Sequence, residues 1–215
     1  MKIINVIKDT FNEALPFQWG MSLFSAGCNL SCKMCKGYNY EKVTDKNNII
    51  GEAIELIDKN ISPMHDCVVF IGGEPLIWDG NLYEALKYCH DLNLKTKIFT
   101  NGICYEEVAK INEQGLCDAW SVDFKVLHNA KEELGIDNKD YIKFVTESIR
   151  NIQSYRLPLE IRTTFYKGNE VDREKITKYV IEHFITPYKK ENPELYIDYI
   201  EQEDARDLLG KDTTC

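Results

Sequence analysis

Apolar residues along this chain form two patterns, short continuous runs and longer stretches in which they recur at helical spacing. Continuous runs are typical of strands that are buried on both faces, as in a parallel sheet. Such strands are predicted at residues 21–26, 67–71, 97–99, 119–124, 159–165 and 195–200. Helical spacing predicts helices around residues 50–61, 82–89, 108–111, 141–152 and 176–184. Residues 3–7 form a further candidate, for an edge strand.

The order of these elements, strand then helix repeated, indicates an α/β fold. Parallel strands joined by helices take right-handed crossovers and build a parallel sheet with the helices outside. Six such units fit an incomplete (β/α)6 barrel, because a closed eight-stranded barrel needs about 250 residues and this chain has 215. We expect a single domain over residues 1–215, with its core at about 21–200 and a C-terminal tail at 201–215.

The most distinctive residues directly follow the predicted strands. The first strand leads into a cysteine-rich loop at residues 28–35, and the next three end in Gly72-Gly73-Glu74-Pro75, Thr100-Asn101-Gly102 and Asp123-Phe124-Lys125. In barrels of parallel strands the carboxyl ends of the strands meet on one face, where the functional site lies. The pattern therefore predicts one site that is built from these four loops.

The three cysteines of the first loop, Cys28, Cys32 and Cys35, have the spacing Cys-x-x-x-Cys-x-x-Cys. A loop this short can turn three thiolates toward one metal centre. A cubane iron–sulfur cluster normally takes four cysteines and a structural zinc site takes four ligands. Three thiolates therefore leave one metal position open for another ligand. On the loop alone, a zinc knuckle and three unrelated core cysteines remain alternatives.

The composition excludes several classes of function. A formal net charge of −9 argues against a nucleic-acid binder and gives no polybasic attraction to a membrane. The first twenty residues lack a signal-peptide core, and no apolar run reaches membrane-spanning length. We therefore expect a cytoplasmic protein with no nucleic-acid or membrane partner. Eight cysteines in that compartment indicate metal or redox chemistry rather than disulfides, and the five outside the loop are interpreted as small buried hydrophobic residues.

Together, the cysteine spacing and the glycine-rich loop resemble the signature of the radical S-adenosylmethionine (SAM) superfamily. Within it, five segments in order look like those of the glycyl-radical-enzyme activases, most of all the anaerobic ribonucleoside-triphosphate reductase activating proteins. These segments are residues 26–30, 72–75, 100–102, 123–125 and 162–164, and the resemblance covers about residues 21–165. It implies a [4Fe–4S] cluster and SAM as cofactors.

The resemblance also implies roles for individual residues. The implied cluster ligands are Cys28, Cys32 and Cys35, and the fourth iron would take the amino and carboxylate groups of SAM. The implied SAM-binding set comprises Met34, Gly72, Gly73, Glu74, Thr100, Asn101, Asp123, Lys125 and Arg162. Within that set, the glycine backbone would approach the methionine part closely and the Glu74 carboxylate would accept a hydrogen bond from its amino group. No catalytic residue is expected beyond the cluster and SAM.

The activity implied is that of a radical SAM activase, in which the cofactors carry the chemistry. One electron from the reduced cluster would cleave SAM into methionine and a 5′-deoxyadenosyl radical, which would remove a hydrogen atom from the α-carbon of a glycine in a partner enzyme. Anaerobic (class III) ribonucleotide reductase is the expected partner, and flavodoxin or ferredoxin the expected electron donor. A glycine loop of another protein needs a wide barrel mouth, which an incomplete barrel supplies.

Two positions depart from the activase pattern. Met34 stands where the superfamily often has an aromatic residue near the adenine, and it is an apolar, adaptable replacement. Phe99 stands where related activases often have Asp before Thr-Asn-Gly, which removes the acidic ligand of a monovalent cation site.

Three other interpretations account for part of this pattern. A small-molecule radical SAM enzyme such as 7-carboxy-7-deazaguanine synthase shares the first motifs, but that family typically has Thr shortly after the third cysteine, and here the next threonine is Thr44. A peptide-modifying radical SAM enzyme usually carries an additional domain. A non-catalytic iron–sulfur or zinc-binding module would leave the glycine-rich loop unexplained.

Overall fold

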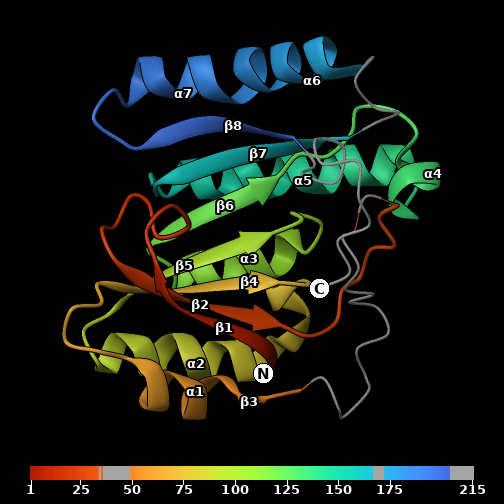
Figure 1. Ribbon diagram of the computed structural model, residues 1–215. Helices are drawn as coiled ribbons and strands as arrows, with labels where there is room; N and C mark the ends of the chain where they lie inside the picture. The colour runs from red at the N-terminus through yellow and green to blue at the C-terminus, as the bar shows by residue number, and fades with distance from the viewer. Residues whose placement is uncertain (34, 36–48, 167–171, 204–215) are drawn as a thin grey trace.

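The computed structural model describes residues 1–33, 35, 49–166 and 172–203. An eight-stranded sheet forms its centre, with the strands in the order β3-β1-β2-β4-β5-β6-β7-β8 (Figure 1). Six neighbouring strands are parallel: β2 (Gly20–Ser25), β4 (Cys67–Gly72), β5 (Lys95–Thr100), β6 (Ala119–Asp123), β7 (Leu159–Phe165) and β8 (Ile197–Glu203). Each of them overlaps a strand predicted from the sequence.

The remaining two strands extend one edge of the sheet in the antiparallel sense. Strand β1 (Lys2–Thr10) pairs with β2, and the two-residue strand β3 (Gly51–Glu52) pairs with the start of β1. The strand predicted at residues 3–7 is therefore confirmed and is longer, but β3 and not β1 is the outermost strand of the sheet. Strands β3 and β8 end the order without pairing to each other, so the sheet stays open. The α/β fold class and the incomplete (β/α)6 barrel with outer helices are confirmed.

Helices follow the parallel strands and pack one apolar stripe against the sheet (Figure 1). They are α1 (Ala53–Asn60), α2 (Asp79–Asp91), α3 (Tyr105–Glu113), α4 (Ala130–Leu134), α5 (Asn138–Ser154), α6 (Arg173–Val180) and α7 (Thr186–Glu191). A π-helical turn, Ile181–Ile185, joins the last two, so the helix predicted at 176–184 continues further than its periodicity indicated. In the part of the chain that is described, no helix has the length and apolarity needed to cross a membrane.

The inner side of the sheet is closed at the amino ends of the strands. Lys97 on β5 and Glu160 on β7 form an ion pair with 2.9 Å between nitrogen and oxygen, and their side chains are 0% and 2% exposed. The Lys97 ammonium also donates a hydrogen bond to the carbonyl of Leu15. Ala14 packs with Cys67, Val69 and Phe99 in a small second core, so the segment 11–19 plugs this end of the barrel.

Candidate functional site

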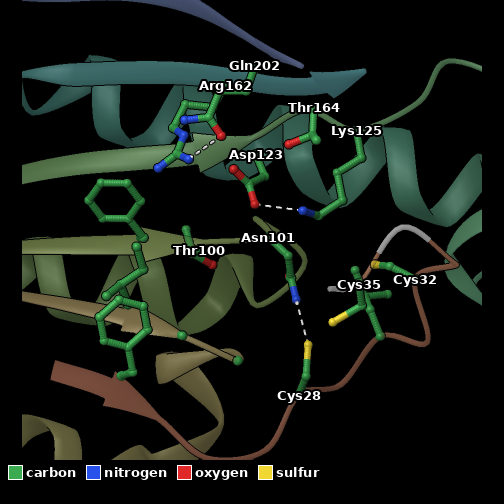
Figure 2. Close-up of a pocket in the computed structure, with 16 residues that line it drawn as sticks. Cys28, Cys32, Cys35, Thr100, Asn101, Asp123, Lys125, Arg162, Thr164 and Gln202 are labelled. Carbon is green, nitrogen blue, oxygen red and sulfur yellow. Dashed lines mark hydrogen bonds and ion pairs between the residues drawn. The ribbon is translucent and has the colours of Figure 1, made fainter. Parts of the chain in front are cut away.

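A cavity of about 330 Å³ lies at the opposite end, where the parallel strands finish (Figure 2). Its lining residues are Phe24, Cys28, Leu30, Cys32, Cys35, Ile71, Gly72, Gly73, Phe99, Thr100, Asn101, Asp123, Lys125, Arg162, Thr164 and Gln202. The four predicted loops therefore meet at one place. Of the predicted site residues that the structure describes, only Glu74 is missing from this wall, and it lies behind it. Met34 lies outside the described residues.

The cysteine loop is held in place by the short helix α4. The backbone N–H groups of Ser31 and Lys33 donate to the carbonyls of Leu134 and Glu133, at 3.0 and 2.9 Å. The Lys33 ammonium also pairs with the Glu133 carboxylate at 3.1 Å. Carbonyls in the last turn of a helix have no partner within the helix, so α4 offers acceptors where the loop has donors. Cys28 and Cys32 are half-buried on this loop, and Cys35 is exposed.

The three thiols fit the donor set of a cluster with one open iron position better than that of a single ion. Within the described residues, no group of three or more His, Cys, Asp or Glu side chains could hold a single metal ion. A structural zinc site needs four ligands around one ion, whereas a cubane presents its irons at separate corners. Figure 2 shows Cys28, Cys32 and Cys35 around one side of the cavity.

Burial keeps the two inner thiols protonated while the cluster is absent. Burial, with a smaller contribution from the nearby Glu74 carboxylate, raises the pKa of Cys28 to about 12. Burial also raises the pKa of Cys32, against the opposing effect of the Lys125 ammonium. The thiolate is the form that binds metal, so cluster ligation must displace these protons and becomes easier as the pH rises.

The glycine-rich loop touches the start of the cysteine loop. Gly72 has a φ of +114°, and a Cβ added there would lie 2.6 Å from the backbone nitrogen of Ser25. Only glycine fits such a position. The next two N–H groups, of Gly73 and Glu74, donate to the carbonyls of Ser25 and Gly27 at 3.0 and 2.8 Å. Gly72 and Gly73 line the cavity, and their close approach to the methionine part of SAM stays a prediction.

The Glu74 side chain points into the protein rather than into the cavity. Its carboxylate, 0% exposed, accepts hydrogen bonds from the Asn101 N–H at 2.7 Å, the Thr100 hydroxyl at 2.9 Å and the Leu76 N–H at 3.2 Å. In this structure Glu74 fixes the loop that carries Thr100 and Asn101. Its contact with the amino group of SAM stays a prediction.

An ion pair and a stacked guanidinium form the next part of the wall. The Lys125 ammonium donates to Asp123 at 2.6 Å, and the Lys125 N–H donates to the Tyr141 hydroxyl at 2.6 Å. Burial alone would raise the pKa of Asp123, but Lys125 and Arg162 outweigh it and hold that pKa below its usual range. Burial would likewise lower the pKa of Lys125, yet Asp123 and the Cys32 sulfur raise it. Both groups are therefore charged at neutral pH.

Arg162 reaches the inner end of the cavity from β7. Its guanidinium carbon lies 4.8 Å from the centre of the Phe99 ring, and Nη2 donates to the Gln202 side-chain oxygen at 2.6 Å. On the same strand as Phe99, the ammonium of the buried Lys97 lies 4.8 Å from the ring centre. Phe99, the residue that departs from the activase pattern, therefore makes cation–π contacts with both Lys97 and Arg162.

Sequence reasoning missed the apolar and supporting residues of the site. Phe24, Ile71 and Gln202 line the cavity. They belong to strands, and which side of the sheet their side chains occupy is known only from the pairing register. Thr164 could have been found, because it lies two positions after Arg162 and alternate strand residues share a face. Glu133 belongs to a helix too short to show periodicity.

The cysteines outside the loop are mostly core residues, as predicted. Cys67, Cys89 and Cys117 are buried in the apolar clusters. Cys104 is half-buried and lies next to the site, where the Asn29 amide donates to its sulfur at 3.0 Å. Cys215 lies outside the described residues.

An open α/β barrel with three cysteines and a glycine-rich loop around one cavity defines a class of iron–sulfur enzyme. The family model of the radical SAM superfamily matches residues 22–180, and this chain belongs to that superfamily. Its cofactors are a [4Fe–4S] cluster and SAM.

Curated relatives fall into more than one activity class. A Methanocaldococcus jannaschii protein provisionally named as a glycyl-radical enzyme activating enzyme is 24% identical over 83% of this chain and 75% of its own length. The 7-carboxy-7-deazaguanine synthase of Clostridium acetobutylicum is 25% identical over 85% of this chain and 79% of its own length. The 4-hydroxyphenylacetate decarboxylase activating enzyme of Clostridioides difficile is 29% identical, over 56% of this chain and 40% of its own length.

Solved structures with the same fold are more distant in sequence. Native anSMEcpe with bound AdoMet superposes with a TM-score of 0.55 at 15% identity, over 82% of this chain and 49% of that one. A TYW1 structure with a lysine-pyruvate adduct gives 0.54 at 15% identity, over 87% and 66%. These likenesses concern the fold, and they agree with the open barrel described above.

Proposed function

We propose that this chain is a radical SAM activase that installs a glycyl radical on a partner enzyme. The proposed partner is anaerobic (class III) ribonucleotide reductase, and the proposed electron donor is flavodoxin or ferredoxin. The observation that carries the proposal is the size of the cavity. At about 330 Å³ it is at the low end of the range for small-molecule sites, about 300–1,000 Å³. SAM would take most of it, so the second reactant would enter from outside.

The relatives also support an activase function. Matches to activating enzymes recur, and one of them extends over most of both chains. A glycine residue suits a small remaining space, because it brings no side chain to the site. The open edge of the sheet, between β3 and β8, agrees with a substrate that is part of another protein.

In this proposal the chain binds, orients and shields, while the bound cluster and SAM supply one-electron cleavage of a carbon–sulfur bond. Cys28, Cys32 and Cys35 hold the cluster. The backbone of Gly72 and Gly73 would hold the methionine part of SAM, and the Asp123–Lys125 pair would offer one acceptor and one donor to its polar groups.

The inner end of the cavity has a separate role. Phe24, Ile71 and Phe99 exclude water from the reacting carbon, and Arg162 offers N–H donors to a backbone carbonyl of the substrate. Holding the glycine α-carbon in contact with the radical is the main contribution that the protein must make.

A second candidate is a small-molecule enzyme of the 7-carboxy-7-deazaguanine synthase type. The match to that enzyme over most of both chains favours it. Arg162 also fits this activity, because a guanidinium inside a barrel can bind a substrate carboxylate in a bidentate manner. The two candidates differ in whether the hydrogen donor is a free molecule or part of a protein.

The test is electron paramagnetic resonance under reducing, oxygen-free conditions. The reconstituted protein is mixed with SAM and purified class III ribonucleotide reductase. A doublet from a carbon-centred radical should appear on the reductase and should vanish when its acceptor glycine is changed to alanine. The Cys32→Ala variant serves as the control without a cluster. SAM turnover that depends on a free small molecule, with no radical on any protein, would replace the activase proposal with the second candidate.

A further inference from the structure

The side chain of Asn29, inside the cysteine loop, joins that loop to the turn after β5. Its Oδ1 accepts a hydrogen bond from Nδ2 of Asn101 at 2.7 Å, and its Nδ2 donates to the sulfur of Cys104 at 3.0 Å. The same Nδ2 of Asn101 lies 3.8 Å from the sulfur of Cys28, as the dashed line in Figure 2 marks. Asn29 itself does not line the cavity, so this arrangement concerns the cluster side of the site.

The direction of these bonds is determined by the backbone. Oδ1 of Asn101 accepts the N–H of Ile103 at 3.1 Å, so the NH2 end of Asn101 must face the cysteine loop. Asn29 must then present its oxygen to Asn101 and its nitrogen to Cys104. Each amide therefore has one orientation that satisfies all of its partners.

Both hydrogens of the Asn101 side-chain amide have a hydrogen-bond acceptor. One is donated to Asn29, and the other points toward Cys28. An N–H that faces a cluster thiolate favours the more electron-rich reduced state, and hydrogen bonds to the sulfurs are among the factors that set a cluster's reduction potential. Outer partners of this kind also orient the ligand.

We propose that Asn101 donates a hydrogen bond to the Cys28 sulfur and that Asn29 is the positioning residue that holds it there, so that together they raise the reduction potential of the cluster. This inference rests on the proposed ligation of the cluster by Cys28. It concerns how readily the cluster accepts its electron and is independent of which molecule later loses a hydrogen atom.

The burial of the two residues explains why they differ in role. Asn101 is 5% exposed, and its backbone N–H is bonded to the buried Glu74 carboxylate. Asn29 is exposed, so its replacement leaves no cavity, and the main loss is the acceptor of one Asn101 amide hydrogen. The Asn29→Ala variant therefore removes hydrogen bonds with little other change to the fold.

The test is a redox titration of the reconstituted cluster, followed by electron paramagnetic resonance, in a double-mutant cycle. Asn101→Ala should lower the equilibrium constant for cluster reduction about tenfold, which is about 59 mV for one electron. Asn29→Ala should lower it about threefold with unchanged iron content. In the double variant the shift should equal that of Asn101→Ala alone, because Asn29 acts through Asn101.

Two further variants keep the result interpretable. Cys104→Ala removes the other partner of Asn29 and should leave the potential unchanged, as should Asn12→Ala, an exposed asparagine at the opposite end of the barrel. If Asn101→Ala fails to hold iron, Asn101→Ser replaces it in the cycle. Additive shifts, or a shift for Cys104→Ala as large as for Asn29→Ala, would overturn the proposal.

The outcome separates this inference from the proposed function. No partner enzyme is present in the titration, so the shifts can be found even if no protein radical ever forms. Conversely, radical formation on the reductase together with an unchanged potential in Asn29→Ala would leave the activase proposal standing and reject the positioning role.

Discussion

The buried carboxyl of Glu74 allows a direct test of the electrostatics at the site. Burial raises its pKa from the ordinary 4.5 to about 7, although the hydrogen bonds from Asn101, Thr100 and Leu76 work in the other direction. The perturbation is Glu74→Gln, which keeps the size of the side chain and one acceptor oxygen but cannot titrate. We compare how the stability of the two proteins depends on pH.

The sign follows from linkage between protonation and folding. A carboxyl whose pKa is raised in the folded state contributes its full stability below the unfolded pKa and loses that contribution as the pH rises through the folded pKa. Here the window runs from 4.5 to about 7. At about 1.36 kcal/mol per pKa unit, the difference between the two values amounts to about 3 kcal/mol. The wild type should therefore lose about 3 kcal/mol relative to Glu74→Gln across this window.

The assay is urea unfolding of the cluster-free protein, with its cysteines kept reduced, from about pH 5 to about pH 8. Other groups titrate in the same range, but they do so in both proteins, and the difference isolates Glu74. Glu84→Gln, at an exposed position on α2, controls for the loss of one negative charge. Glutamine offers one acceptor oxygen in place of two, so we expect the unfolding free energy of Glu74→Gln to differ from that of the wild type by an additional amount that does not depend on pH. Parallel pH profiles for wild type and Glu74→Gln would refute the reasoning.

The other predictions concern the cluster, the glycine-rich loop and the buried Lys97–Glu160 pair at the amino ends of the strands. Cys32→Ala should abolish stable cluster assembly because two thiolates cannot hold a cubane, whereas Cys89→Ala should keep its iron; iron and sulfide analysis decides. Gly72→Ala should lose SAM affinity about tenfold or more by equilibrium binding, because the new Cβ meets the neighbouring backbone, while Gly80→Ala, with open space around it, should bind normally. Lys97→Met should destabilise the fold by about 3–5 kcal/mol in urea, since it leaves a buried carboxylate unpaired; a loss under about 1 kcal/mol would contradict this.

The strands and the location of the site could be predicted from the sequence because both depend on local patterns. Short strand-like segments between the helical stretches marked all six parallel strands, and the topology rule for parallel barrels then placed the residues that follow them on one face. The cysteine loop and the glycine-rich loop needed only residue type and spacing. For these parts, neighbours along the chain carry the information.

The direction of single side chains could not be predicted in the same way. The sequence does not show that the Glu74 carboxylate takes three donors from inside the protein, beside the predicted hydrogen bond from SAM. These contacts depend on where the turn at Thr100 lies relative to β4, which is a matter of register between strands. The ion pair between Glu133 and Lys33 of the cysteine loop could not be predicted for the same reason, because the two residues lie a hundred positions apart in the sequence.

Phe99 lies between two parts of the barrel, one that is buried from solvent and one that is open to the cavity. Toward the amino ends of the strands, the Lys97–Glu160 pair is sealed from solvent, and its attraction is strong because water does not screen it. Toward the carboxyl ends, Arg162 shares the cavity with whatever ligand enters. The aromatic ring at the boundary contacts a cation of each part. A ligand can therefore enter or leave the cavity on one side of this ring without bringing water to the buried ion pair on the other side.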